Sequence, residues 1–309
     1  MIRSIKNRFK ALAGSVFQCG QYFGWDILPR HFYSEIPDLR KLRKTTSWKL
    51  PYSMICVRGL GIDSQSAFVR SLIPPDRRKS LAEAGIHRSA SKNNGEEGFG
   101  PIEAECLHAF VETQKPARIV QIGCGVSTAI CIAAAEAAKY KPDILCIEPY
   151  PNGFLKSASE RGSIRMIPKG VEDLPPDEVV GGLSDGDLFF VDSSHVLGPA
   201  GEVSRIILEC LPRLTAGVNV HFHDVYFPYD YPGNLLNGAL FFHHESVLLH
   251  AFLCGHPRFR VLASLSHLHH AAPEILRECF LNYSPRENDH GLAKSPGHFP
   301  SSTYLLVTE

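Results

Sequence analysis

Acidic and imidazole side chains follow two apolar segments of the sequence, at the point where each segment ends. Asp192 and His195 come after the first segment, and His223 and Asp224 come after the second. Such apolar segments are typical of buried parallel strands, and ligands bind at the carboxyl ends of these strands. A neutral imidazole beside a substrate hydroxyl can accept its proton. We therefore predict a catalytic site here, with His223 or His195 as the base and Asp192 beside it.

A glycine-rich turn precedes these segments, with the sequence VQIGCGVST at residues 120–128. Gly123 and Gly125 allow a ligand to approach the backbone closely, and the helix expected after them offers free N–H groups. A dinucleotide-binding turn has a third glycine three positions after the second, where this chain has Thr128. The turn therefore favours a ligand without a pyrophosphate, such as S-adenosylmethionine, over a nicotinamide dinucleotide.

A single acidic residue, Glu148, ends the next apolar segment. A carboxylate at this position can accept hydrogen bonds from both hydroxyls of a ribose. A solvated acid at a strand end is the alternative, and the glycine turn upstream favours the ribose interpretation. The two features together predict a nucleoside-bearing cofactor.

Short apolar segments alternate with helical ones from residue 101 onward, which is typical of a parallel sheet with crossover helices. The expected strands are residues 118–122, 143–147, 163–167, 187–191 and 218–222, and two more at 259–265 and 303–307 could close the sheet. The expected helices are residues 102–113, 127–140, 153–161, 201–214 and 235–254. The pattern predicts an α/β fold with a Rossmann-like, mostly parallel sheet and helices on both faces.

Four segments resemble one known family. They are HFYSEIPD (31–38), VQIGCGVSTAI (120–130), GDLFFVDSSHV (186–196) and VHFHDVYFPYDYP (220–232). Over about residues 20–309 the chain resembles the bacterial class I methyltransferases often labelled Methyltransferase-24-like. This resemblance implies a seven-stranded sheet, S-adenosylmethionine as the methyl donor, and substrates that are commonly small molecules or sugars.

The resemblance also implies which residues hold the donor. Glu172 or Asp173 is expected near the adenine, and Glu148 at the ribose. Many methyltransferases have an acid where this chain has Gln121, so the contacts at the amino-acid end of the donor are expected to differ. The predicted cofactor-binding set is Gln121, Gly123, Gly125, Ser127, Thr128, Glu148, Glu172 and Asp192.

A divalent metal is a further prediction from the family. Some related O-methyltransferases hold a cation with an acid after the fourth strand and two residues after the fifth. Asp192, His223 and Asp224 stand at those positions. Hard cations such as Mg²⁺ prefer oxygen ligands, so a histidine in the set favours a softer metal. The sequence leaves open whether these residues hold a metal or act without one.

The charge balance and the cysteines limit the class of protein. Thirty-two basic residues balance 32 acidic ones, which disfavours binding to nucleic acid. Nine cysteines, none of them in a Cys-x-x-Cys pair, lie mostly in apolar segments. This predicts buried, reduced thiols in a cytoplasmic enzyme. The sequence has no apolar run of about 18 residues, so we predict no transmembrane helix.

Residues 1–25 combine apolar and basic positions without an acid. The pattern is typical of a helix that packs on its own chain or on a partner, and it also fits a membrane-surface or targeting helix. Five apolar residues recur at helical spacing, and four basic residues lie among them: Ile2, Ile5, Phe9, Leu12 and Val16, with Arg3, Lys6, Arg8 and Lys10.

We predict three parts of the chain. Residues 1–73 are expected to form a cap of helices and loops, and residues 101–309 to form the methyltransferase domain. Between them, residues 74–100 are rich in proline, glycine and polar residues. This composition predicts a flexible loop, which is either a linker or a lid over the site.

The sequence therefore predicts an S-adenosylmethionine-dependent methyltransferase that acts on a hydroxyl group of a small metabolite or sugar. A nitrogen acceptor, a macromolecular acceptor and a homo-oligomer stay open. A methyltransferase fold that has lost catalysis and serves as a binding module is a second hypothesis, which Gln121 would support. An NAD-dependent Rossmann oxidoreductase is a third, and the missing third glycine disfavours it.

Overall fold

The computed structural model describes the chain except for residues 1, 33, 232–234, 237–241 and 286–299, with only the backbone for residues 2–11. The chain divides into two compact units, Met1–Thr45 and Thr46–Glu309. The smaller unit holds helix α1 (Ile2–Tyr22) and the short α2 (Leu39–Leu42). No helix in the described part of the chain is both long and apolar enough to cross a membrane.

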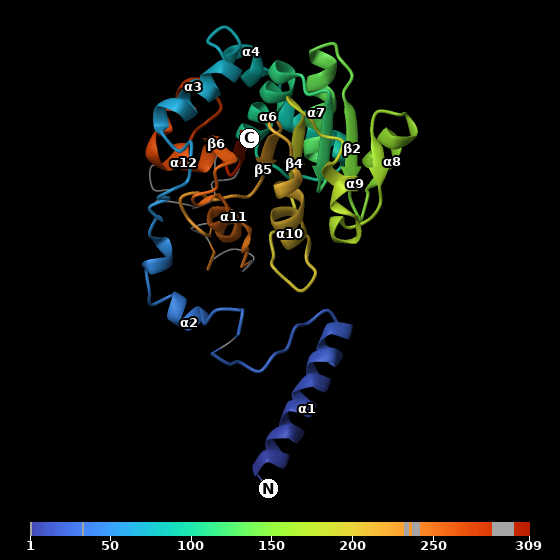
Figure 1. Cartoon of the computed structure of the whole chain (residues 1–309), viewed down its shortest axis with the longest axis vertical. Helices are drawn as coiled ribbons and strands as arrows, with labels where there is room; N and C mark the ends of the chain where they lie inside the picture. Colours follow the sequence, from blue (N-terminus) through green and yellow to red (C-terminus); the bar gives the residue numbers. More distant parts are fainter. Residues whose placement is uncertain (1, 33, 232–234, 237–241, 286–299) are drawn as a thin grey trace. The chain divides into compact units, whose positions relative to one another are not determined.

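Seven strands form one sheet in the larger unit, in the order β3-β2-β1-β4-β5-β7-β6 (Figure 1). Neighbouring strands from β3 to β5 are parallel, and β7 runs antiparallel to both β5 and β6. The predicted seven-stranded, mostly parallel sheet is confirmed. The strands are β1 (Arg118–Ile122), β2 (Asp143–Ile147), β3 (Arg165–Ile167), β4 (Leu188–Val191), β5 (Asn219–Phe222), β6 (Phe259–Ser264) and β7 (Thr303–Val307).

Successive side chains of β1 pack into different cores on the two faces of the sheet. Ile119 lies in one core, and Val120 and Ile122 lie in the other. Because both faces are buried, the strands are almost continuously apolar. The first core is covered by α3 (Ile62–Leu72), α4 (Arg78–Glu83), α5 (Ile86–Asn94), α6 (Pro101–Gln114), α7 (Val126–Ala137), α8 (Gly153–Glu160), α12 (Leu265–Ala271) and α13 (Pro273–Cys279). The second is covered by α9 (Pro176–Val180), α10 (Glu202–Arg205) and α11 (Glu245–Leu253).

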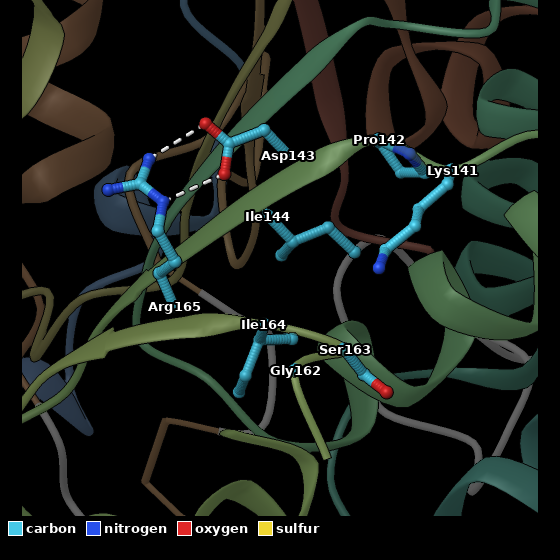
Figure 2. A pocket seen from close by; sticks show the side chains of 8 residues that line it. All are labelled: Lys141, Pro142, Asp143, Ile144, Gly162, Ser163, Ile164 and Arg165. Carbon is cyan, nitrogen blue, oxygen red and sulfur yellow. Dashed lines mark hydrogen bonds and ion pairs between the residues drawn. The ribbon is translucent and has the colours of Figure 1, made fainter. Parts of the chain in front are cut away.

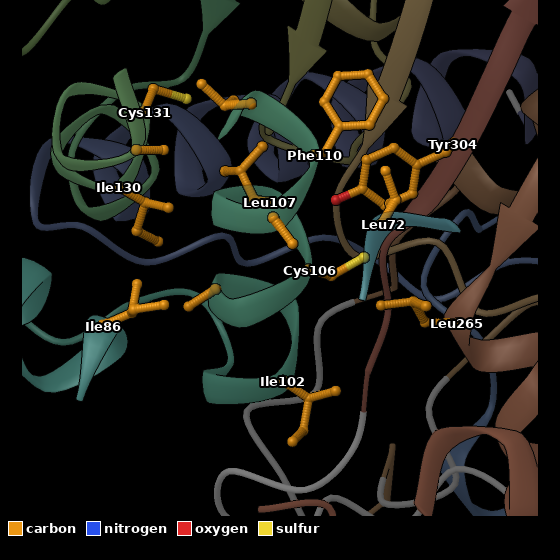
Figure 3. Packing of buried hydrophobic residues seen from close by; sticks show 14 of the residues in the cluster. Leu72, Ile86, Ile102, Cys106, Leu107, Phe110, Ile130, Cys131, Leu265 and Tyr304 are labelled. Atoms are coloured by element: carbon orange, nitrogen blue, oxygen red, sulfur yellow. The ribbon is translucent and has the colours of Figure 1, made fainter. Parts of the chain in front are cut away.

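Helix α6 runs through the middle of the first core (Figure 3). The ring of its Phe110 lies 5.3 Å from the ring of Tyr304 on β7, and Leu72 of α3 lies in the same cluster. Its first turn also buries an acid, Glu103, which is only 3% exposed. The packing of α6 therefore fixes the position of the acidic side chain of Glu103.

The structure corrects the predicted flexible loop at residues 74–100. This segment forms α4 and α5, which bury Leu81, Ile86 and Ala90 in the first core. Gly85 and Gly95 adopt left-handed φ angles of 59° and 84° at the two ends of α5, a conformation that glycine adopts at little cost. Ile86 and Ala90 stand four residues apart on one face of α5, and the polar composition around them concealed this spacing.

Two predicted helices also differ from the structure. The helix expected over residues 235–254 begins only at Glu245; residues 242–244 are not helical, and 237–241 lie outside the described residues. The helix expected over residues 201–214 starts as α10 and continues as a π-helical turn and a 3-10 turn. Pro212 lacks the backbone N–H that a continuing α-helix needs.

Candidate functional site

The glycine turn lies between β1 and α7, as predicted. Gly123 has a φ of 75°, and a Cβ atom at this position would collide with the backbone carbonyl of Asp192. The turn is thereby packed directly against the end of β4, where the Asp192 N–H donates to the Ile122 carbonyl at 2.8 Å. The N–H of Gly125 donates to the Thr128 hydroxyl at 3.2 Å and fixes the start of α7.

The carboxylate of Glu148 lies beside this turn, at the carboxyl end of β2. It accepts hydrogen bonds from the N–H of Cys124 at 3.2 Å and from the N–H of Tyr150 at 2.9 Å. The side chain is half-buried. The acid and the turn are therefore brought together as the sequence predicted.

Four predicted donor-binding residues occupy less direct positions. Gln121 and Thr128 are fully buried, and the amide of Gln121 faces the sulfur atoms of Cys131 and Cys146 at 3.8 and 3.9 Å. In this arrangement both residues support the turn from within the core. Glu172 lies in a short turn after β3, one strand further toward the edge of the sheet. Ser127 is in the first turn of α7 and is 4% exposed.

His223 lies between two carboxylates at the carboxyl end of β5. Its Nδ1 is 3.1 Å from Oδ1 of Asp192, and its Nε2 is 3.2 Å from Oε1 of Glu103. The ring of Phe99 stacks on the imidazole at a centroid distance of 4.4 Å. The site thus combines Phe99 and Glu103, which precede the glycine turn in the sequence, with residues that follow the turn.

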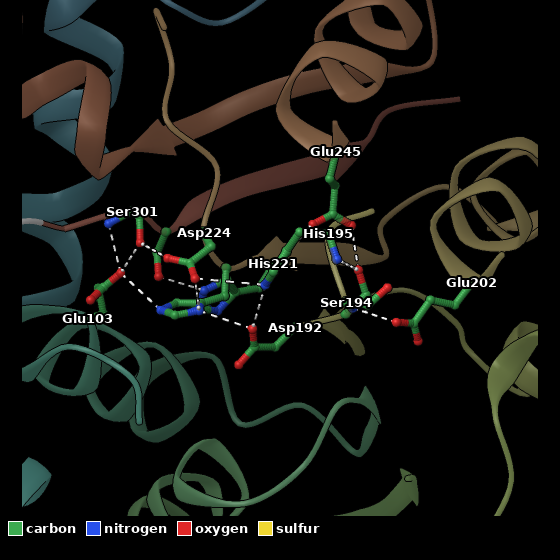
Figure 4. Close-up of polar contacts among 12 residues, drawn as sticks. Glu103, Asp192, Ser194, His195, Glu202, His221, Asp224, Glu245 and Ser301 are labelled. Carbon is green, nitrogen blue, oxygen red and sulfur yellow. Dashed lines mark hydrogen bonds and ion pairs between the residues drawn. The ribbon is translucent and has the colours of Figure 1, made fainter. Parts of the chain in front are cut away.

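His195 is held by the first turn of α11 (Figure 4). Its Nδ1 donates to Oε2 of Glu245 at 2.7 Å, and Oε1 of the same acid accepts from the Ser193 hydroxyl at 3.0 Å. The other ring nitrogen, Nε2, lies 3.5 Å from Asp192 and 3.8 Å from Asp224. His195 and Asp224 both have left-handed φ angles, 62° and 54°, which are costly outside glycine and often mark functional sites.

Opposite charges decide the protonation of this cluster. Burial lowers the pKa of His195, but Asp192 and Glu245 outweigh it and raise the pKa to about 10. Burial also lowers the pKa of His223, and the surrounding carboxylates hold it well above its usual value. Burial raises the pKa of Asp192, but the two imidazoles hold it far below its usual value. Both imidazoles therefore hold a proton more strongly than a free histidine does.

His221, on the same strand as His223, has a different role. Its ring is fully buried, packs 4.3 Å from the Tyr304 ring, and bonds to the Ser302 hydroxyl at 2.8 Å. Burial holds its pKa well below the usual value, with a further contribution from His223. It is a neutral core histidine.

The predicted metal ligands come together, but they bond to one another. Within the described residues, no group of three or more His, Cys, Asp or Glu is placed to hold a metal ion. Asp192 and Asp224 lie 3.1 and 3.9 Å from Nδ1 of His223. A metal requires a neutral imidazole with a free lone pair, and here both ring nitrogens of His223 face carboxylates. The set does not fit a metal ion in this arrangement.

Sequence reasoning missed the residues that complete the cluster. Glu103 and Glu245 were assigned only to expected helices, and Ser301 to no element. Ser301 lies 2.8 Å from both Glu103 and Asp224 (Figure 4). The available signal was acids within largely apolar helical segments: Glu245 in ESVLLHAFL at 245–253, and Glu103 with Glu105 in PIEAECLHAF at 101–110.

One pocket lies away from these residues. A cavity of about 310 Å³ lies at the amino ends of β2 and β3, where Arg165 makes two 2.8 Å hydrogen bonds to Asp143 (Figure 2). None of the predicted site residues lines it. Ligands of open α/β sheets bind at the carboxyl ends, so we do not assign the cofactor to this cavity.

Comparisons with known proteins identify one domain within the chain. Residues 120–225 match a family model described as a methyltransferase domain. An uncharacterized protein of Archaeoglobus fulgidus is 29% identical over 136 residues, a match that covers 41% of this chain and 60% of the relative. The chain thus matches less than two thirds of that relative's length.

Two solved structures align with most of this chain. The S-adenosylhomocysteine-bound methyltransferase PaMTH1 of Podospora anserina has 17% sequence identity and a TM-score of 0.40, covering 80% of this chain and 95% of its own. Cofactor-bound Rv0187 from MTB has 14% identity and a TM-score of 0.45, covering 76% and 98%.

The family match contains every element of the site that lies on β1, β2, β4 and β5. It begins before the glycine turn and ends just after Asp224, and it includes Glu148 and His195. The seven-stranded sheet is the one that the family resemblance implied. Over residues 120–225 the chain is therefore similar to the methyltransferase domain that this family model describes.

Proposed function

We propose that the chain transfers the methyl group of S-adenosylmethionine to a hydroxyl group of a small metabolite or sugar. The observation that carries this proposal is the His195–Glu245 pair, which stands at the same sheet edge as the glycine turn and Glu148. The link between them is Asp192, whose backbone packs against the turn and whose carboxylate faces His195.

In this proposal the first two strands hold the donor. The glycine turn and the start of α7, including Ser127, lie against its amino-acid end, and Glu148 accepts hydrogen bonds from the ribose hydroxyls. Glu172, after the third strand, lies near the adenine. Gln121 and Thr128 do not touch the donor in this proposal; from the core they keep the glycine turn in its conformation.

The chemical step is an in-line displacement at the sulfonium methyl. The bond between the methyl carbon and sulfur breaks as the carbon–oxygen bond forms, and the sulfonium becomes a neutral thioether. The proton of the acceptor hydroxyl passes to Nε2 of His195, while Nδ1 keeps its hydrogen bond to Glu245. His223 holds Asp192 in place from the other side.

His195 must be neutral to accept this proton, although its pKa in the free protein is about 10. The sulfonium of the donor is a cation, and a like charge nearby lowers the pKa of an imidazolium. We therefore expect donor binding to release a proton. Calorimetry in buffers of different ionisation enthalpy should detect proton release with S-adenosylmethionine and less release with neutral S-adenosylhomocysteine.

The direct test combines binding with turnover. Titration calorimetry should show binding of S-adenosylhomocysteine and none of NADH, and incubation of the purified chain with donor and a panel of hydroxylated metabolites should give a product heavier by one methyl group. Binding of NADH alone would refute the proposal. Donor binding without any turnover would favour the non-catalytic binding module. Activity lost in EDTA and restored by Mg²⁺ or Mn²⁺ would show that Asp192 and Asp224 rearrange around a cation.

A further inference from the structure

The charge of the chain is divided between its two compact units. Residues 1–45 contain nine basic and three acidic residues, a formal charge of +6. The remaining residues contain 23 basic and 29 acidic ones, a formal charge of −6. Although the net charge of the whole chain is zero, its smaller unit is therefore strongly basic. The proposed catalytic site lies in the larger unit and does not explain this basic charge.

The sequence of α1 arranges these charges beside an apolar stripe. At 3.6 residues per turn, the positions of Ile2, Ile5, Phe9, Leu12 and Val16 fall within an arc of roughly 80°. Basic residues take the positions on the two sides of this arc: Arg3, Lys6 and Lys10 on one side and Arg8 on the other. A narrow apolar stripe with flanking cations is typical of a helix that lies in a membrane–water interface.

Large apolar side chains in the second half of α1 and just after it remain exposed. Tyr22 is 86% exposed, Phe23 and Trp25 are each 70% exposed, and Leu12 is 61% exposed. Val16, Cys19, Gly20, Phe23, Trp25 and Ile27 line an apolar hollow within the same unit. Exposed aromatic residues beside basic ones match the composition of the interfacial region of a bilayer, where Trp and Tyr are enriched.

We propose that residues 1–32 dock on an anionic lipid surface, with α1 lying in the interface and Trp25 as an anchor. A nucleic acid would pair with the basic residues but would leave the aliphatic stripe exposed to water. An anionic bilayer can contact both the basic residues and the aliphatic stripe. It repels the rest of the chain, which has a net negative charge. The docking therefore has to go through this unit.

Vesicle sedimentation with the full chain tests this proposal. We expect the chain to bind phosphatidylcholine vesicles that contain phosphatidylglycerol and to bind pure phosphatidylcholine much more weakly. Four basic residues near the surface correspond to a preference on the order of 10²–10³-fold. High salt and the combined change Arg3→Gln, Lys6→Gln, Arg8→Gln and Lys10→Gln should each remove most of this preference. Trp25→Ser should weaken binding to both kinds of vesicle.

A matched variant controls for loss of positive charge alone. Lys79→Gln, Lys141→Gln, Lys156→Gln and Lys169→Gln remove the same charge from exposed positions of the larger unit and should leave vesicle binding unchanged. Three outcomes would overturn the proposal. The first is no binding to either kind of vesicle, and the second is equal binding to both kinds. The third is binding to duplex DNA but not to vesicles. S-adenosylhomocysteine binding should be the same in every variant, so this test is independent of the proposed catalysis.

Discussion

Glu245 and His195 stand 50 residues apart in the chain and are joined by a 2.7 Å hydrogen bond. Two backbone hydrogen bonds join the same segments: the N–H groups of His244 and Glu245 donate to the His195 carbonyl at 2.8 and 3.2 Å. The first turn of α11 therefore fixes both the ring and the backbone of His195. Since Nδ1 is committed to Glu245, Nε2 is the nitrogen that faces Asp192 and Asp224.

Removing this imidazole is expected to stop the chemistry and to spare the donor site. His195→Ala should lower turnover about 10²–10⁴-fold with nearly unchanged affinity for S-adenosylhomocysteine. Glu245→Gln keeps the size of the side chain but loses its charge, and should lower turnover at least about tenfold. Glu274→Gln, at an exposed position of α13, is the control. Wild-type turnover in His195→Ala would exclude His195 as the base.

His223 is expected to matter for stability as well. Without its ring, the buried carboxylate of Glu103 and the half-buried carboxylate of Asp192 would face each other without a cation between them. Breaking a buried ion pair in this way costs about 3–5 kcal/mol. His223→Ala should therefore lower the free energy of unfolding by about that amount in urea denaturation. A change of only a few tenths of a kcal/mol would mean that the two acids become protonated or hydrated in the variant.

Glu148 is expected to contribute directly to donor affinity. Glu148→Ala should weaken S-adenosylhomocysteine binding by about 1.5–3 kcal/mol, because the ribose hydrogen bonds are made to a charged acceptor. Titration calorimetry measures the change, with the exposed Glu136→Ala as a control. The bound ligand should raise the melting temperature of the wild-type protein. Unchanged affinity in Glu148→Ala would place the ribose elsewhere.

The segment between α5 and α6 is expected to respond to the donor. The side-chain oxygen of Asn94 lies 3.1 Å from the place where a Cβ atom on Gly125 would be, and Phe99 stacks on His223. Hydrogen exchange of residues 94–100 should slow when S-adenosylhomocysteine is added. Exchange that does not change in 94–100 would leave this segment as a connection only.

Acid is expected to destabilise the fold partly through His270. Burial, with smaller contributions from His269 and His267, lowers its pKa to about 3. An unfolded histidine titrates near 6.5. Below that pH the unfolded chain gains a proton that the folded protein does not, so the stability that is complete above pH ~6.5 is lost as the pH falls toward 3. His270→Phe should reduce the fall in melting temperature between neutral and acidic pH, whereas the exposed His31→Phe should not.

The strands and the acids that follow them could be predicted because their signals are local. The expected bounds 118–122, 143–147 and 303–307 are those of β1, β2 and β7. A buried strand must be apolar along its length, and the polar residue that ends it stands at the sheet edge. Asp192 and His195 were found by this rule, and the structure places them together.

The partners of those residues could not be predicted in the same way. Glu103 and Glu245 reach the site from helices on opposite faces of the sheet. Their role depends on contacts with residues 50 or more positions away, and such contacts leave no local pattern in the sequence. The helices α12 and α13 were missed for another reason. Each has seven residues, which is too short for a periodic pattern to be distinct.

The position of β7 sets an order of events during synthesis. This strand, formed by residues 303–307, lies between β5 and β6 and is the strand with which β6 pairs. Until the ribosome has released these residues, β5 has an open edge and β6 lacks its neighbour. Ser301, which joins Glu103 to Asp224, also arrives only then. A nascent chain that already contains the glycine turn therefore still lacks the complete cluster at the sheet edge, and β5 keeps an exposed edge until β7 inserts.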